Sequence, residues 1–93
     1  MIDEMQKLRD ALDAANVSWY DDSTRGHGMY ICRTKFTNKY DEPCSVILGE
    51  GISYGWQAGL LEVMPPLYRD TDYDDEVQGW LTADEIITAW IEG

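Results

Sequence analysis

The densest group of side chains that could carry chemistry lies in residues 70–76, where five of the seven residues are acidic. Three aspartates alternate from Asp70 onward, at the spacing of the first three ligands of a calcium-binding loop. Such a loop also needs glycine at its sixth position and glutamate at its twelfth, where this chain has Asp75 and Leu81. The segment therefore does not match a calcium loop. We expect no dedicated metal site, although weak, nonspecific binding of divalent ions stays open.

Three further residues, His27, Cys32 and Cys44, have side chains that could bind a metal or support nucleophilic chemistry. Their spacing contains no C-x-x-C or H-x-x-x-H pair, so it does not predict a zinc site. A cysteine–histidine nucleophile would need Cys32 exposed beside His27, but Cys32 lies in an alternating segment typical of a strand. We therefore expect no catalytic residue and no cofactor. Both thiols are expected to be reduced, unbonded and buried.

Aromatic residues accompany the acidic segment. Tyr68, Tyr73 and Trp80 lie within it or beside it, and Tyr54 and Trp56 lie in the glycine-rich connection before it. Tyrosine and tryptophan are common at protein-binding hot spots because they combine a large contact area with a low entropic cost. Ordinary packing at the edge of the core is the alternative interpretation of these aromatics, and the sequence leaves it open.

The N-terminal residues that must support such a site predict a helix over residues 1–15. Met5, Leu8 and Leu12 recur at spacings of three and four, so they share one face of a helix. Asp3 precedes them at the position of an N-cap.

Four segments predict β-strands, at residues 17–20, 29–36, 44–48 and 59–64. The second and third are separated by a turn and should form an antiparallel hairpin. Its register sets Cys32 opposite Ile47 or Leu48. Cys44 then lies too far along the sheet from Cys32 for a disulfide.

The C-terminal residues carry the clearest local signal in the chain. Thr82 is followed three residues later by Glu85, which predicts a capping box at the start of a helix over residues 82–91. Ile86, Ile87 and Trp90 should contribute to the buried face of that helix. Residues 21–28 and 67–79 read as a turn and a polar loop.

The order of these elements predicts one α+β domain over residues 1–93. An antiparallel four-stranded sheet should be flanked by an N-terminal and a C-terminal helix, both covering one face of the sheet.

The net charge of the chain is −11 and is unevenly distributed. Residues 1–39 hold six acidic and six basic residues and sum to zero. Residues 40–93 hold the other twelve acids and one base, Arg69, and so account for the whole −11. A charge of this size exceeds what solubility requires, and an acidic surface steers association with a basic partner. A solvated acidic loop is the simpler alternative.

The same charge argues against two classes of function. Direct binding of nucleic acid needs lysine and arginine to neutralise phosphates, and this chain has few of them. No apolar run approaches the length of a membrane span, and the first residues have no secretory signal, which predicts a cytoplasmic protein. We therefore expect the partner to be a basic, nucleic-acid-binding protein. The residues expected to bind it are Tyr68, Asp70, Asp72, Tyr73, Asp74, Asp75, Glu76 and Trp80.

The compact acidic chain, with its ending Gly79-Trp80-Leu81-Thr82-Ala83-Asp84-Glu85-Ile86-Ile87, resembles small accessory proteins of phages and prophages. Among these are anti-CRISPR proteins, some of which imitate the charge of DNA. The resemblance is one of size, acidity and texture, without a family motif, and no site residue is carried over from it. It implies a phage-type inhibitor that occludes the nucleic-acid-binding surface of a host defence protein in the host cytoplasm. An antitoxin or immunity-like partner of a basic toxin and a small-molecule-binding domain are the alternatives.

Overall fold

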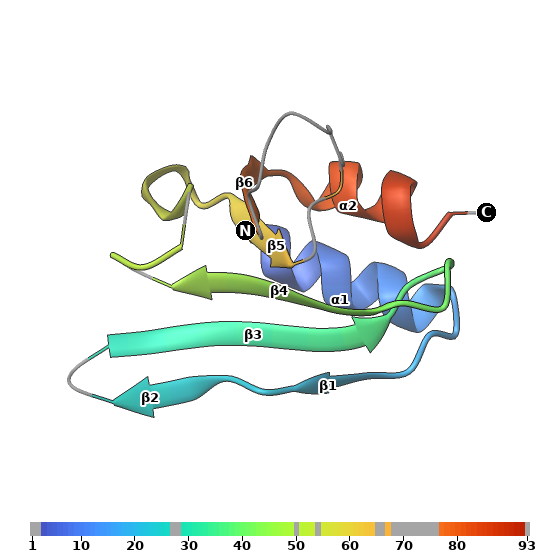
Figure 1. Cartoon of the computed structure of the whole chain (residues 1–93), viewed down its shortest axis with the longest axis horizontal. Coiled ribbons are helices and arrows are strands. Elements are labelled where there is room, and N and C mark those ends of the chain that lie inside the picture. The colour runs from blue at the N-terminus through green and yellow to red at the C-terminus, as the bar shows by residue number, and fades with distance from the viewer. Residues whose placement is uncertain are drawn as a thin grey trace.

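In the computed structural model, which describes residues 3–26, 29–49, 51–53, 55–64, 67 and 77–92, two helices pack on an antiparallel sheet (Figure 1). The helices are α1 (Glu4–Ala14) and α2 (Ala83–Trp90), with a short 3-10 helix, η1 (Trp56–Ala58). The strands are β1 (Trp19–Asp21), β2 (Thr24–Gly26), β3 (Met29–Thr37), β4 (Pro43–Gly49), β5 (Leu61–Met64) and β6 (Gln78–Leu81). The predicted α+β class is confirmed.

The sheet has the strand order β1-β3-β4-β5-β6, and β2 pairs with β3 beyond the end of β1. It therefore has six strands where the sequence predicted four. The two additional strands are β2 and β6. β2 lies within residues 21–28, which were predicted to be a turn, and β6 begins at the end of the loop predicted over residues 67–79. Neither has an apolar alternation of its own. Each forms by pairing along the edge of a stronger neighbour, β3 or β5, and periodicity cannot detect that.

The central hairpin has the predicted register. Cys32 lies opposite Leu48, and Cys44 lies opposite Phe36, four residues further along β3. Both cysteines are accordingly free thiols. Cys44 is buried as predicted, but the prediction is wrong for Cys32, which is only half-buried. Because paired residues share a face of the sheet, the same register places Cys32, Phe36, Cys44 and Leu48 on the side of the helices.

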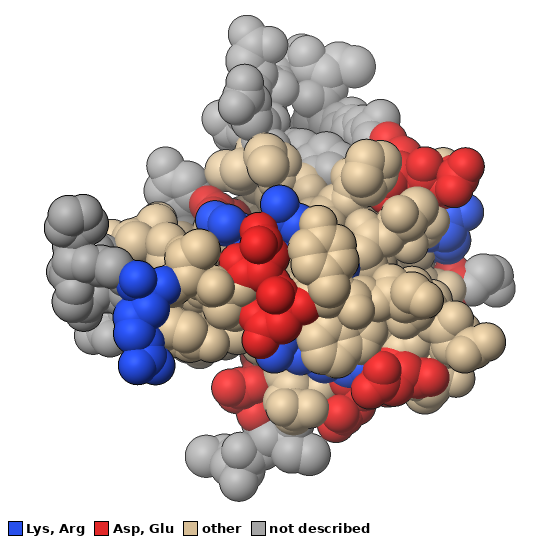
Figure 2. Space-filling model, turned by 90° about the horizontal axis from the view of Figure 1, so that it is seen from below, with Lys and Arg blue, Asp and Glu red and all other residues tan. Residues whose placement is uncertain are grey.

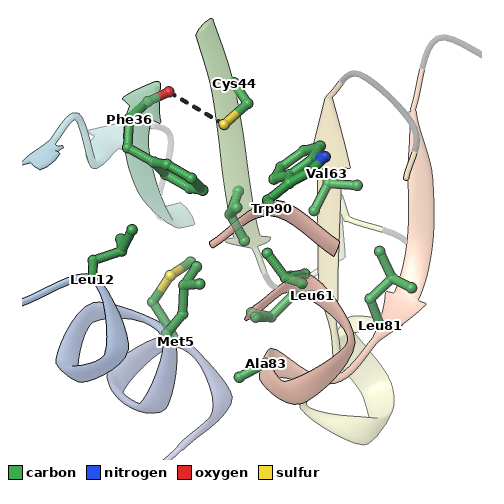
Figure 3. Packing of buried hydrophobic residues seen from close by; sticks show 12 residues of the cluster. Met5, Leu12, Phe36, Cys44, Leu61, Val63, Leu81, Ala83 and Trp90 are labelled. Atoms are coloured by element: carbon green, nitrogen blue, oxygen red, sulfur yellow. Dashed lines mark hydrogen bonds between the residues drawn. The ribbon is translucent and has the colours of Figure 1, made fainter. Parts of the chain in front are cut away.

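The core lies between that face and the two helices (Figure 3). Trp90 of α2 is 4% exposed and meets the ring of Phe36 edge-on, with the ring centroids 5.9 Å apart. The predicted contributions of Ile86 and Trp90 to the buried face are confirmed, and Ile87 packs at the margin of the core. The buried apolar residues come from both helices and from β3, β4, β5 and β6: Met5, Leu8, Leu12, Phe36, Cys44, Val46, Leu61, Val63, Leu81, Ala83, Ile86 and Trp90.

Helix α1 is fixed on the sheet by Arg9. Its Nε donates a hydrogen bond to Thr34 Oγ1 at 2.7 Å, and its guanidinium lies 4.9 Å from the centre of the Trp19 ring. The same group forms an ion pair with Asp21 at 3.5 Å. Thr34 Oγ1 in turn donates to Met5 Sδ at 3.2 Å. One side chain of α1 therefore holds both β1 and β3.

The start of α2 is capped from two directions. Thr82 Oγ1 accepts from the Glu85 N–H, and Glu85 Oε1 accepts from the Thr82 N–H at 3.2 Å, which is the predicted capping box. In addition, Glu4 Oε2 of α1 accepts from the Ala83 N–H at 2.8 Å. The carboxylate of Glu4 therefore satisfies another free donor of α2 and joins the two helices.

Lys39, in the turn between β3 and β4, covers the other end of α2. Its Nζ donates to the Glu92 carbonyl at 2.6 Å, and its backbone N–H donates to the Trp90 carbonyl at 2.8 Å. The last turn of α2 contains no basic residue of its own. Lys39 therefore supplies the positive charge that the C-terminal end of a helix favours.

Replacing Thr82 with alanine should lower the free energy of unfolding by about 1 kcal/mol, because the Glu85 N–H loses its acceptor. Urea denaturation followed by circular dichroism measures the change. The matched control is Thr88→Ala, an exposed position in the same helix, which should leave stability unchanged or slightly higher. An equal loss in both variants would contradict the capping role.

Candidate functional site

Of the eight residues predicted to bind a partner, Trp80 is the one that lies among the described residues. The other seven lie outside the described residues: Tyr68, Asp70, Asp72, Tyr73, Asp74, Asp75 and Glu76. His27 and Tyr54, on which the sequence analysis also made predictions, lie outside them too.

The framework on either side of the acidic segment is described. β5 ends at Met64 and β6 begins at Gln78, and Gln78 is the register partner of Val63. The two strands that the segment connects are therefore hydrogen-bonded neighbours. Val63 and Leu81 are 1% and 2% exposed, so both strands are held by the core.

Trp80 lies on β6 with 55% of its surface exposed, whereas Trp90 is almost fully buried. Trp56, in η1, is half-buried. Trp80 is therefore not part of the buried core, although packing at the edge of the core stays open for it. Its exposure is consistent with the contact role predicted from the sequence.

The sheet face opposite the helices carries a groove that the sequence analysis did not identify. Tyr20, Lys35, Ser45 and Met64 are successive register partners across β1, β3, β4 and β5, so they form one row on this face. The groove beside them has a volume of about 770 Å³ and is open to solvent. Alternation along β3 could assign Lys35 to this face, but the row depends on register across four strands.

The charges along the β1 edge of the sheet are paired with one another. Asp22 forms ion pairs with Lys35 at 3.1 Å and with Arg33 at 3.6 Å, and Arg9 pairs with Asp21. Figure 2 shows the result on the face seen from below, where acidic and basic side chains adjoin. This part of the surface has mixed charge and is not the acidic face expected of a nucleic-acid mimic.

The same contacts lower the pKa of both aspartates. For Asp21 the main causes are hydrogen bonds from the Ser23 hydroxyl and backbone N–H, with a smaller contribution from Arg9. For Asp22 the main cause is the hydrogen bond and positive charge of Lys35, followed by Arg33. Both carboxylates are therefore more stable as anions in the folded chain than in the unfolded chain.

The buried thiol of Cys44 is unsuited to nucleophilic chemistry. Burial, together with the negative charge of Glu42, raises its pKa to about 12. Its Sγ donates a hydrogen bond to the Phe36 carbonyl at 3.2 Å (Figure 3). The reactive thiolate is therefore essentially absent at neutral pH.

Comparison with known proteins identifies no relative: no family model, no curated protein and no solved structure matches the chain. Within the described residues, no group of histidine, cysteine and acidic side chains is arranged to hold a metal ion. The described helices are also too short or too polar to cross a membrane. The site must therefore be interpreted from its own residues.

Cys44 should resist alkylation in the native protein at pH 7 and react only after unfolding in urea. Mass spectrometry of peptides from iodoacetamide-treated protein measures the modification of each cysteine separately. Cys32, which is half-buried, provides the internal comparison and should react faster. Rapid native labelling of Cys44 would contradict its assignment as a buried, protonated thiol.

Asp21 and Asp22 should make the free energy of unfolding fall more steeply in acid than it would without these two carboxylates. Because their folded pKa values lie below the ordinary 3.8, their contribution to stability is complete above that value and is lost as the pH falls through the lowered values. The double variant Asp21→Asn/Asp22→Asn should therefore lose less stability than wild type between neutral pH and pH values near and below 3.8. Urea midpoints measured across this range test the expectation. Parallel curves for the two proteins would contradict it.

Proposed function

We propose that this protein is an inhibitor of the phage accessory type that binds a basic protein and occludes its nucleic-acid-binding surface. The observation that carries the proposal is the charge of residues 40–93, which hold twelve acids and one base. An imbalance of −11 cannot be neutralised within that part of the chain. It attracts a basic surface and repels nucleic acid.

The basic residues of residues 1–39 already have partners within the fold, which supports the proposal. The four ion pairs between described residues all lie within residues 1–39, and they involve Lys7, Arg9, Arg33 and Lys35. Lys39 is directed to the end of α2, and the Arg25 guanidinium lies 5.3 Å from the centre of the Tyr30 ring. These six residues therefore already have contacts within the fold, which supports a role other than binding phosphate.

The groove beside Lys35 supports contact with a protein better than capture of a small molecule. Pockets for small ligands enclose most of the ligand and present convergent polar groups. This groove is open, and the ammonium group of Lys35 is already paired with Asp22 at 3.1 Å. Tyr20 and Met64, at the two ends of the row beside the groove, are 59% and 51% exposed and can instead extend an interface.

Removing three charges from the acidic segment should weaken binding while leaving the fold intact. The partner is first isolated from host lysate on the immobilised wild-type domain, identified and purified. The triple variant Asp72→Asn/Asp74→Asn/Asp75→Asn should then associate with it more slowly, and with a weaker dependence on salt, than wild type. Stopped-flow or biosensor kinetics between 50 and 300 mM salt, about the range over which screening changes strongly, measure both effects.

The matched control removes three charges from the helical layer with Asp10→Asn/Asp84→Asn/Glu92→Gln, at exposed positions. It has the same net charge as the first variant and should keep most of the wild-type association rate. Equal rates for wild type and the Asp72, Asp74 and Asp75 variant, with no dependence on salt, would contradict the proposal. Equal losses in the two variants would show that total charge acts, not the acidic segment.

A further inference from the structure

Trp80 has a backbone conformation that a tryptophan rarely adopts. Its φ is +59°, in the left-handed region. The other described non-glycine residues with positive φ are Asn16 and Asp41, whose short polar side chains tolerate this region. A bulky residue there is an outlier, and such outliers concentrate at functional sites.

The strain arises from a β-bulge. Leu61 pairs with Leu81 and Val63 pairs with Gln78, so Gly79 and Trp80 together face the single residue Glu62. The neighbouring glycine could adopt positive φ without strain, yet the positive φ falls on Trp80 and not on Gly79. The bulge therefore turns a tryptophan out of the regular strand.

The surroundings hold Trp80 in this conformation. Leu81, immediately after it, is anchored in the core. On the other side, a side chain at Gly55 would place its Cβ 2.9 Å from both the backbone N and the Cα of Trp80. Gly55 itself has φ +100°. The backbone of Trp80 is thus fixed by a buried neighbour and by a loop packed directly against it.

The indole of Trp80 makes few contacts that would stabilise the fold. It is 55% exposed, and it makes no hydrogen bond or ring contact with another described residue. The positive φ opposes folding, and the exposed part of the indole contributes no burial that would offset this cost. A partner that covers the indole would gain the burial that the fold leaves unused.

We propose that Trp80 is the hydrophobic anchor of the interface and inserts its indole into an apolar pocket of the partner, bordered by arginine or lysine. The inference rests on the proposed function for the basic character of that partner. Cations pack favourably over an indole, and tryptophan is enriched among hot-spot residues. Trp80 lies four residues after Glu76, so the acids that steer the partner and the anchor that holds it belong to adjacent parts of the chain.

The test compares Trp80→Asn with Tyr40→Asn. Tyr40 is also an exposed aromatic, at 63%, but its φ is not positive. Asparagine tolerates positive φ, so the Trp80 variant should unfold at a urea concentration no lower than the Tyr40 control does. The dissociation rate from the purified partner should rise roughly thirtyfold for Trp80→Asn and stay unchanged for Tyr40→Asn. The association rate and its dependence on salt should remain those of wild type.

Two outcomes would overturn the anchor. A urea midpoint for Trp80→Asn well below that of Tyr40→Asn would make the indole a structural residue. An unchanged dissociation rate would remove it from the interface. Failure of the proposed function gives a different result. If the anchor is right and the proposed function is wrong, Trp80→Asn still speeds dissociation from the partner. Association of the partner is then independent of salt and of the acidic segment.

Discussion

The contact of Arg9 with the sheet is the constraint on which the other parts of the structure depend. Its side chain is only 16% exposed, so its charge must be satisfied inside the protein, and Thr34, Trp19 and Asp21 do so. These contacts fix the position of α1 on β1 and β3. α1 then holds Glu4 at the start of α2, where its carboxylate accepts from the Ala83 N–H. Polar contacts of Arg9 and Glu4 thus join α1 to the sheet and to α2, above a core of buried apolar residues.

This arrangement has a consequence for the surface. The bases of residues 1–39 stabilise the fold, through ion pairs, a ring contact and the carbonyls at the end of α2, and most of the acids lie in the other part of the chain. Acidic and basic side chains adjoin at the β1 edge (Figure 2), whereas residues 40–93 hold twelve acids and one base. The bases of residues 1–39 thus have structural contacts, as do Glu4, Asp21, Asp22 and Glu85 among the acids.

Features that depend on neighbours in the sequence could be predicted, and features that depend on distant partners could not. The caps at Asp3 and Thr82 and the pairing of Cys32 with Leu48 follow from local spacing and alternation. β2 and β6 exist through pairing with β3 and β5, and the Glu4 cap joins residues 79 positions apart. For the candidate site, the sequence supplies the charge and identifies Trp80 as an aromatic of interest. The positive φ of Trp80 comes from a bulge against Glu62 and contact with Gly55, which only the folded chain brings together.

The central claim is that this domain and nucleic acid bind the same surface of the partner. The most direct measurement is the affinity of the purified partner for a fluorescent oligonucleotide at increasing concentrations of the domain. Competition predicts that the apparent dissociation constant of the oligonucleotide rises in proportion to the domain concentration, without limit. A plateau, or a complex that contains partner, domain and oligonucleotide together, would contradict the claim.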